Sequence, residues 1–308
     1  MTYLLLSLGL LLLFVGGDWL VSGSVAVAKR MKVSPLLIGL TLVGFGTSTP
    51  ELTTSLIATY KGSNGIAIGN VVGSNIANIL LILGVTALIL PVQVKGKSIR
   101  RDSAFLIFSC LLLLSSLAFG SIGRIMGLIM VASLIFYIVY CYRTEREEGA
   151  DENEKMPPLW RSIVLTFVGI GLTMLGAKFL VDNSVILART WGISESVIGL
   201  TIVAVGTSLP ELAASVMSAI RKHSDVALGN VIGSNIYNAL FILGVTSLCM
   251  PIQIPAGMWI DMLIMTGVTA LMIGIALGYK KFTRATGVIF LISYAIYIVY
   301  LAQMGQIS

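Results

Sequence analysis

Charged side chains are scarce in this chain: 11% of its 308 residues are charged and 56% are hydrophobic, with a mean hydropathy of +0.97. A soluble domain carries about 25% charged residues, so the composition predicts an integral membrane protein. The sequence has one histidine, His223, which excludes a histidine triad or a histidine metal cage. The three cysteines, Cys110, Cys141 and Cys249, are odd in number and widely spaced, which argues against a disulfide framework or a zinc site.

Long apolar segments take up most of the sequence. A helix needs about 20 mostly apolar residues to cross a bilayer. On that criterion we predict an all-α membrane protein with ten transmembrane helices, at residues 3–28, 36–60, 66–91, 102–120, 122–142, 160–188, 196–220, 226–251, 258–279 and 285–303.

One segment occurs twice. Gly39–Pro91 aligns without a gap on Gly199–Pro251, an offset of 160, with 28 of 53 positions identical. Each half of the chain then has five spans, and because five is odd the second half enters the membrane from the opposite side. This pattern predicts two inverted-topology repeats. We expect the first five-helix repeat at 1–143, a cytoplasmic polar linker at 144–159 and the second repeat at 160–308.

The basic residues predict an orientation. Most of the 20 lysines and arginines fall in five loops on one side of the predicted bilayer, which the positive-inside rule assigns to the cytoplasm. We therefore expect a multi-pass protein of the cell membrane with both termini extracellular. This asymmetry explains the pI of 9.3 without nucleic-acid binding. The acidic linker is expected to be a solvated loop, with a regulatory calcium site as the alternative.

The duplicated segment carries two motifs. The first reads Gly-Thr-Ser-Thr-Pro-Glu at 46–51 and Gly-Thr-Ser-Leu-Pro-Glu at 206–211. Proline removes a backbone donor and glycine eases unwinding, so we expect broken helices near Thr47 and Thr207. The second motif, Gly-Ser-Asn-Ile-x-Asn at 73–78 and 233–238, lies in spans 3 and 8, where we also expect breaks. The nearby Gly69/Gly73 and Gly229/Gly233 pairs are expected to allow close helix packing.

Each copy places one acid, Glu51 or Glu211, inside a long apolar stretch. An ionised acid at mid-membrane costs roughly 2.5–3.5 kcal/mol on insertion scales, so two equivalent ones call for a compensating cation or proton. The surrounding donors are hydroxyl, carboxamide and carbonyl oxygens, without sulfur or imidazole. Such hard donors suit calcium, sodium or magnesium and disfavour zinc or copper.

The two motifs resemble the paired alpha repeats of the sodium/calcium exchanger family, within the cation/calcium antiporter superfamily, in its prokaryotic form. The resemblance implies antiport of Na⁺ against Ca²⁺ by alternating access, with spans 1 and 6 sliding as a gate. It also implies the metal ligands of this chain. These are the side chains of Thr47, Ser48, Glu51, Ser74, Asn78, Thr207, Ser208, Glu211, Ser234 and Asn238, and the backbone carbonyls of Gly44 and Ala204. Well-studied relatives have aspartate where this chain has Asn238, so the expected site carries a charge of −2, and Asn238 is expected to bind as a neutral donor.

Structural roles compete with ligation at several of these positions. The hydroxyls of Thr47, Ser48, Thr207 and Ser208 can instead bond back to their own helix. Ser74 and Ser234 can serve close packing, and Asn75 and Asn235 are expected to link helices more than to bind an ion. Outside the motifs, Asp18 and Lys178 are 160 apart with opposite charges, and we consider a buried ion pair between them, with interfacial snorkelling of Lys178 as the alternative.

Other functions remain open from sequence alone. A Ca²⁺/H⁺ antiporter would use the same glutamates as proton carriers, and a cation channel would need a continuous open pathway. An intramembrane enzyme finds no support in a nucleophile or a water-activating metal motif. We therefore expect a transporter rather than an enzyme, with no cofactor and no obligatory protein partner. Its expected partners are Na⁺ and Ca²⁺ as substrates and the lipid bilayer.

Overall fold

The structure is a computed structural model of the chain, and it describes residues 2–94, 98–144, 157–191 and 204–307. Eight helices in these ranges are long and apolar enough to cross a membrane: Thr2–Met31, Asn64–Ile89, Ser98–Phe119, Arg124–Thr144, Leu159–Thr190, Ser224–Cys249, Met258–Gly278 and Arg284–Gln303. Two shorter apolar helices, Pro35–Thr47 and Leu209–Ile220, accompany them. The protein is thus an all-helical, multi-pass membrane protein. Residues 145–156 of the predicted linker and residues 192–203, which include positions 196–203 of the predicted seventh span, lie outside the described residues.

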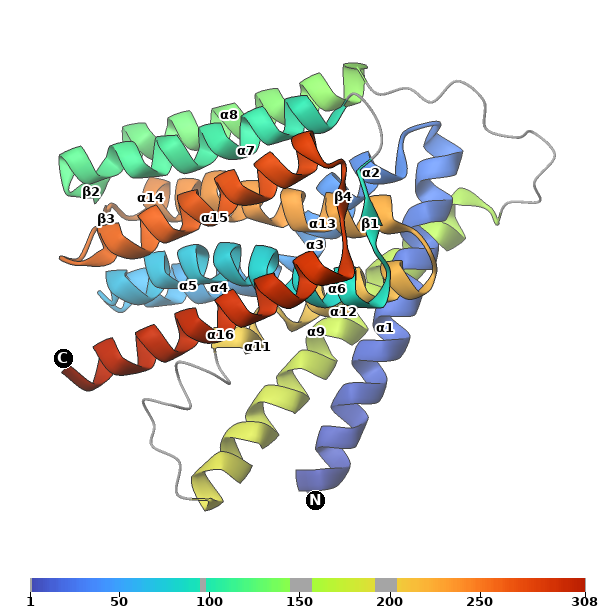
Figure 1. Cartoon of the computed structure of the whole chain (residues 1–308), viewed down its shortest axis with the longest axis horizontal. Coiled ribbons are helices and arrows are strands. Elements are labelled where there is room, and N and C mark those ends of the chain that lie inside the picture. Colours follow the sequence, from blue (N-terminus) through green and yellow to red (C-terminus); the bar gives the residue numbers. More distant parts are fainter. Residues whose placement is uncertain (1, 95–97, 145–156, 192–203, 308) are drawn as a thin grey trace.

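The elements of the first half follow one another closely (Figure 1). They are α1 (Thr2–Met31), α2 (Pro35–Ile38), the π-helical η1 (Gly39–Val43), α3 (Gly44–Thr47), α4 (Thr49–Tyr60), α5 (Asn64–Ala77), the π-helical η2 (Asn78–Leu83), α6 (Gly84–Ile89), β1 (Val92–Gln93), α7 (Ser98–Ser115), the 3₁₀ turn η3 (Ser116–Phe119), β2 (Ser121–Ile122) and α8 (Arg124–Thr144). Local chemistry sets some of these bounds. Helix α2 begins after Ser34, whose Oγ accepts a hydrogen bond from the Leu37 N–H at 3.1 Å, with Pro35 in the first turn.

The second half repeats this order. Its elements are α9 (Leu159–Thr190), α11 (Ala204–Gly206), α12 (Leu209–Ile220), α13 (Ser224–Ile236), the π-helical η5 (Tyr237–Ile242), α14 (Leu243–Cys249), β3 (Ile252–Gln253), α15 (Met258–Gly278), β4 (Lys281–Phe282) and α16 (Arg284–Ile307). Between α3 and α4 the helix is interrupted at Ser48, and between α11 and α12 at Thr207–Ser208. In spans 3 and 8 the departure from α-helix is a π-helical segment instead, which begins at Asn78 and at Tyr237.

Two short strand pairs link the halves, and sequence reasoning did not foresee them. Strand β1 pairs antiparallel with β4, with Val92 opposite Phe282, and β2 pairs with β3, with Ile122 opposite Ile252. These four residues form two sets related by the offset of 160, so each pair is the counterpart of the other.

Helices α1 and α9 lie side by side, at an angle to most of the other helices (Figure 1). Their backbones touch because glycines face each other. A methyl group added at Gly9 would lie 2.9 Å from the Gly176 carbonyl oxygen, and one added at Gly176 would lie 2.8 Å from that of Gly9. Gly16 and Gly169 make the equivalent contact. Because the residues at this interface are small, few side chains interdigitate there to fix the two helices in one register.

The expected Asp18–Lys178 pair is wrong. Asp18 accepts from the guanidinium of Arg221, just beyond α12, and Lys178 is exposed. The reason is geometric: α1 faces α9 through Gly16, and Asp18, two residues later, is rotated by about 200° around the helix away from that face.

Close packing at the glycine pair of the second repeat is confirmed. Gly229 and Gly233 pack against the backbone of α2 and η1, where added methyl groups would lie 2.5 Å from the carbonyl oxygens of Leu36 and Leu40. The positions equivalent to Leu36 and Leu40 are 196 and 200, which lie outside the described residues. Close packing at Gly69 and Gly73 therefore stays a prediction.

Candidate cation-binding site

The two acids occupy equivalent places at the starts of helices. Glu51 is in the first turn of α4 and Glu211 in the first turn of α12, each following a proline. Both side chains are buried, at 0% and 1% exposure. The positive end of the helix dipole favours a negative charge at each position. The Pro-Glu sequence thus delivers a carboxylate to the protein interior beside an interruption in the helix.

Hydrogen bonds between the repeats bring the two motifs together. The Ser48 hydroxyl donates to Glu211 Oε1 at 3.2 Å, and the Ser208 hydroxyl donates to Ser74 Oγ at 3.3 Å. Residues that are about 130 to 160 positions apart in the chain are therefore in direct contact. The first motif of one repeat meets both the first motif and the second motif of the other.

Many oxygen atoms in this region are buried without a partner. Seven of them belong to the candidate metal ligands: Glu51 Oε1 and Oε2, Glu211 Oε2, Asn78 Oδ1, Thr207 Oγ1, Ser234 Oγ and Asn238 Oδ1. Buried polar atoms nearly always have a partner, because leaving one unpaired costs about 1–3 kcal/mol. A dehydrated cation would bind such a group of unpaired oxygens. The group therefore indicates a cation site.

The asparagines divide into two kinds. Asn75 and Asn235 form a reciprocal pair in which each Nδ2 donates to the other's backbone carbonyl at 3.2 Å. This bears out their expected role as a link between helices. Asn78 donates to Asn235 Oδ1 at 2.9 Å and keeps its own Oδ1 unpaired, whereas both side-chain polar atoms of Asn238 lack a partner.

The predicted ligands of the two repeats are not equivalent in detail. The Thr47 hydroxyl bonds back to the Val43 carbonyl at 3.1 Å, which is the alternative considered from sequence, whereas that of Thr207 has no partner. The Gly44 carbonyl accepts from the Ser48 N–H at 3.1 Å, but in the second repeat the Ser208 N–H donates to Val205 instead. Ala204 begins α11, and its side chain lies outside what the structure describes.

Sequence reasoning missed two residues that support the acids. The Asn70 amide donates to the Glu51 carbonyl and to Ser55 Oγ, both at 3.0 Å. Asn230 repeats this arrangement at the Glu211 carbonyl (3.2 Å) and at Ser215 (3.0 Å). Each asparagine ties the helix that carries the acid to the next helix. The signal was available, because both asparagines and both serines are identical at an offset of 160.

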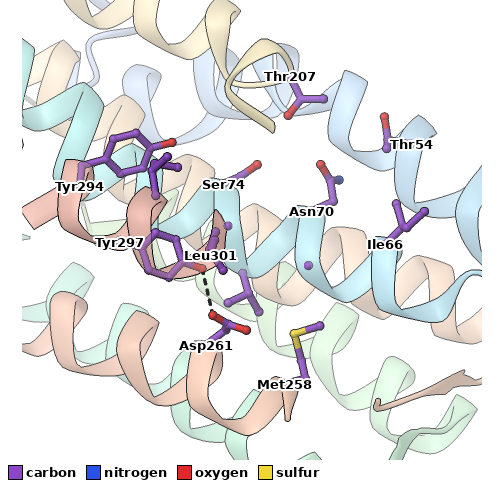
Figure 2. A pocket seen from close by; sticks show the side chains of 14 residues that line it. Thr54, Ile66, Asn70, Ser74, Thr207, Met258, Asp261, Tyr294, Tyr297 and Leu301 are labelled. Atoms are coloured by element: carbon purple, nitrogen blue, oxygen red, sulfur yellow. Dashed lines mark hydrogen bonds between the residues drawn. The ribbon is translucent and has the colours of Figure 1, made fainter. Parts of the chain in front are cut away.

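A cavity of about 370 Å³ adjoins the site. Ser74 and Thr207 line it, together with Asn70, Asp261, Tyr294 and Tyr297 (Figure 2). The described ranges contain no group of three or more His, Cys, Asp or Glu side chains that could hold a metal ion. The candidate site thus relies on two carboxylates and neutral oxygens, with a cavity on one side.

A helical membrane protein with paired buried acids and neutral oxygens belongs to the class of cation transporters. The family profile described as sodium/calcium exchanger protein matches residues 1–143 and 161–303. The chain is a member of the sodium/calcium exchanger family.

Individual relatives agree with this assignment. The sodium/calcium exchanger MaX1 of Methanosarcina acetivorans is 34% identical over 294 residues, covering 82% of this chain and 84% of the relative. The solved structure of the sodium-calcium exchanger NCX_Mj, soaked with zero Na⁺ and Ca²⁺, superposes with a TM-score of 0.85 at 35% identity, over 97% and 98% of the two chains. The Ca(2+)/H(+) antiporter ChaA of Bacillus subtilis is 28% identical over 252 residues, covering 74% and 71%. All three relatives are named as exchangers or antiporters.

Proposed function

We propose that this protein is a secondary active antiporter that exchanges Na⁺ for Ca²⁺ across the cell membrane. The seven unpaired buried oxygens carry the proposal. Calcium takes about 6–8 oxygen ligands, and sodium also prefers hard oxygen donors, so the donor set suits both ions. The candidate ligands are Thr47, Ser48, Glu51, Ser74, Asn78, Thr207, Ser208, Glu211, Ser234 and Asn238, with the carbonyls of Gly44 and Ala204.

Charge explains why the two ions would exchange rather than bind together. Glu51 and Glu211 supply a charge of −2, and the Asn238 side chain adds none. One Ca²⁺ or two Na⁺ neutralise that charge. Binding both at once would leave excess positive charge in a low-dielectric interior, which is strongly unfavourable. One ion must therefore leave before the other is held, which is the requirement for antiport.

The transport step would be alternating access between two inverted repeats, 1–143 and 160–308, joined by the linker at 144–159. Ten spans, with breaks in spans 2, 3, 7 and 8 and both termini extracellular, complete this proposal. Several contacts support the symmetry. Asn75 and Asn235, which form a reciprocal pair, are 160 apart. The same offset converts the Gly9–Gly176 contact into the Gly16–Gly169 contact, and one strand pair into the other. The glycine interface between α1 and α9 suits a pair of helices that moves as one unit against the rest.

A Ca²⁺/H⁺ antiporter is the second candidate. ChaA supports it, since that relative is named for this activity. Two buried carboxylates could also carry protons in place of Na⁺. The Gly-Thr-Ser-x-Pro-Glu motif present in both repeats and the relatives named for sodium favour the first reading.

Flux measurements on the purified protein in liposomes separate the candidates. We expect Ca²⁺ uptake when Na⁺ is loaded inside and omitted outside, with the pH equal on both sides and held by a protonophore. Uptake driven by a proton gradient alone, without Na⁺, would favour the second candidate. Uptake down the Ca²⁺ gradient that is indifferent to Na⁺ and H⁺ would indicate a channel and contradict both.

A further inference from the structure

Among the described residues that line the cavity beside the site, Asp261 is the charged one. Asp261 lies in the first turn of α15 and is half-buried. Its Oδ1 accepts a hydrogen bond from the Tyr297 hydroxyl at 3.1 Å, drawn as the dashed line in Figure 2. Ser74 and Thr207, two candidate ion ligands, line the same cavity. A carboxylate therefore faces the space through which a cation would reach the buried glutamates.

The first repeat contains the counterpart of this pair, in a different state. The Tyr137 hydroxyl donates to Asp102 Oδ1 at 3.0 Å, and Arg101 forms an ion pair with the same carboxylate at 2.7 Å. Asp102 is fully buried. In the second repeat, the residue before Asp261 is Ile260, which offers no cation. In the first repeat, the aspartate of this Tyr–Asp pair is buried and paired with an arginine. In the second repeat, the aspartate lies beside a cavity and the preceding residue supplies no cation.

Small residues of α5 line the cavity beside Asp261. Gly69 and Gly73 are among them, with Ser74 next in the chain. The carboxylate and the candidate ligand Ser74 therefore border one space.

We propose that Asp261 is a weak cation-recruiting site, which holds hydrated Ca²⁺ or Na⁺ in the cavity before the ion passes Ser74 and Thr207. This inference rests on the proposed exchange function. It assigns Asp261 a role in how readily ions reach the site from the outer face, and none in the final coordination. The hydrogen bond from Tyr297 fixes the carboxylate and leaves its other oxygen for the hydrated ion.

The expected effect follows from Coulomb's law. For an ion passing about 8 Å from one full charge in a water-like medium, the attraction concentrates a divalent cation about sixfold and a monovalent cation about 2.4-fold. Asp261→Asn should therefore raise the KM for external Ca²⁺ about sixfold and that for external Na⁺ about 2.4-fold at low ionic strength, with kcat unchanged. The effect should shrink in 0.5 M choline chloride, because salt screens exposed charges.

Chemical modification distinguishes charge from structure. Cys249 is the exposed cysteine and the other two are buried, so Asp261→Cys is made in a Cys249→Ser background. A negatively charged methanethiosulfonate reagent, applied outside right-side-out vesicles, should restore the low KM for Ca²⁺. The positively charged reagent of the same type should raise that KM further. Equal effects of the two reagents, or none, would overturn the proposal.

Two variants keep the result interpretable if the cysteine variant folds poorly. Asp261→Glu keeps the charge and should keep the KM within about twofold, whereas Tyr297→Phe removes the hydrogen bond and keeps the charge. If Tyr297→Phe raises the KM as much as Asp261→Asn does, the pair is a structural brace and the recruiting role is wrong. Loss of Na⁺-driven Ca²⁺ uptake in the unsubstituted protein would instead refute the proposed function itself.

Discussion

Gly233 provides a test of the close contact between α13 and η1. It lies one residue before Ser234, and Gly73 occupies the equivalent position before Ser74 in the duplicated segment. We compare Gly233→Ala with Gly73→Ala. Both variants add one methyl group, and both replace a helical glycine by alanine.

The structure gives the expected magnitude. At Gly233 the new methyl group would lie 2.5 Å from the Leu40 carbonyl oxygen, 2.7 Å from its Cα and 2.9 Å from its carbonyl carbon. All three are backbone atoms, so η1 must move by several tenths of an ångström. Overpacking of this kind costs about 1–3 kcal/mol, which lowers the Tm of a large domain by about 2–4 °C per kcal/mol. At Gly73 no described atom lies within 4 Å of the methyl group, and alanine favours helix over glycine.

Thermal unfolding in detergent, followed by the loss of the monodisperse peak in size-exclusion chromatography, measures both variants. We expect Gly233→Ala to lower the Tm by about 5 °C and to reduce transport, because Ser234 moves with the helix. A Tm of Gly233→Ala equal to that of the unsubstituted protein would refute the close contact between α13 and η1. The Tm of Gly73→Ala measures how tightly α5 is packed at the equivalent position.

Three further predictions concern the site itself. Glu51→Gln and Glu211→Gln should each give folded protein with Ca²⁺ binding weakened by about 2–5 kcal/mol, or roughly 30- to 4,000-fold, because a buried charge loses its partner; calorimetric titration measures this, and near-normal affinity would contradict the ligand assignment. Asn238→Asp should make Ca²⁺ uptake more sensitive to acid, because a third carboxylate brings a charge that a proton can neutralise; an unchanged pH profile between pH 6 and 8 would count against a role for Asn238 as a neutral donor. Asn230→Ala should raise the KM for Ca²⁺ and cost about 1–3 kcal/mol of stability, because the Glu211 carbonyl and Ser215 lose their donor; an unchanged KM with the same stability loss would reduce Asn230 to a purely structural residue.

The sequence was most informative where its features were duplicated. Glu51 and Glu211 could be assigned to an interior site because acids are costly in a membrane, and the same motif surrounds both. The contact from Ser48 to Glu211 shows that residues of the two copies meet. The interhelical role of Asn75 and Asn235 was also predictable, since a carboxamide can satisfy a backbone carbonyl across a close helix contact.

Other features depended on three-dimensional detail that a repeat does not specify. The Asp18–Lys178 pairing failed because an offset of 160 relates two residues by symmetry without placing them near the symmetry axis. Thr47 and Thr207 are identical in sequence, yet the Thr47 hydroxyl bonds to its own helix, whereas that of Thr207 has no partner among the described residues.

The roles of Asn70 and Asn230 were not predicted, for a different reason. The predicted side-chain ligands came from the two motifs, whereas these two asparagines lie outside the motifs and hold the backbone of the first one. Positioning residues of this kind can be found by searching a repeat for every identical polar side chain. Asn70 and Ser55 satisfy that criterion together with Asn230 and Ser215.

Equilibrium binding of radioactive Ca²⁺ to the purified protein, with Na⁺ as competitor, tests most directly whether the two buried carboxylates hold both ions in turn. We predict one Ca²⁺ bound per chain, displaced by Na⁺ with a steepness that requires more than one sodium ion. We further predict no specific binding when Glu51 and Glu211 are both replaced by glutamine. Retention of Ca²⁺ by that double variant, or indifference of bound Ca²⁺ to Na⁺, would contradict the account.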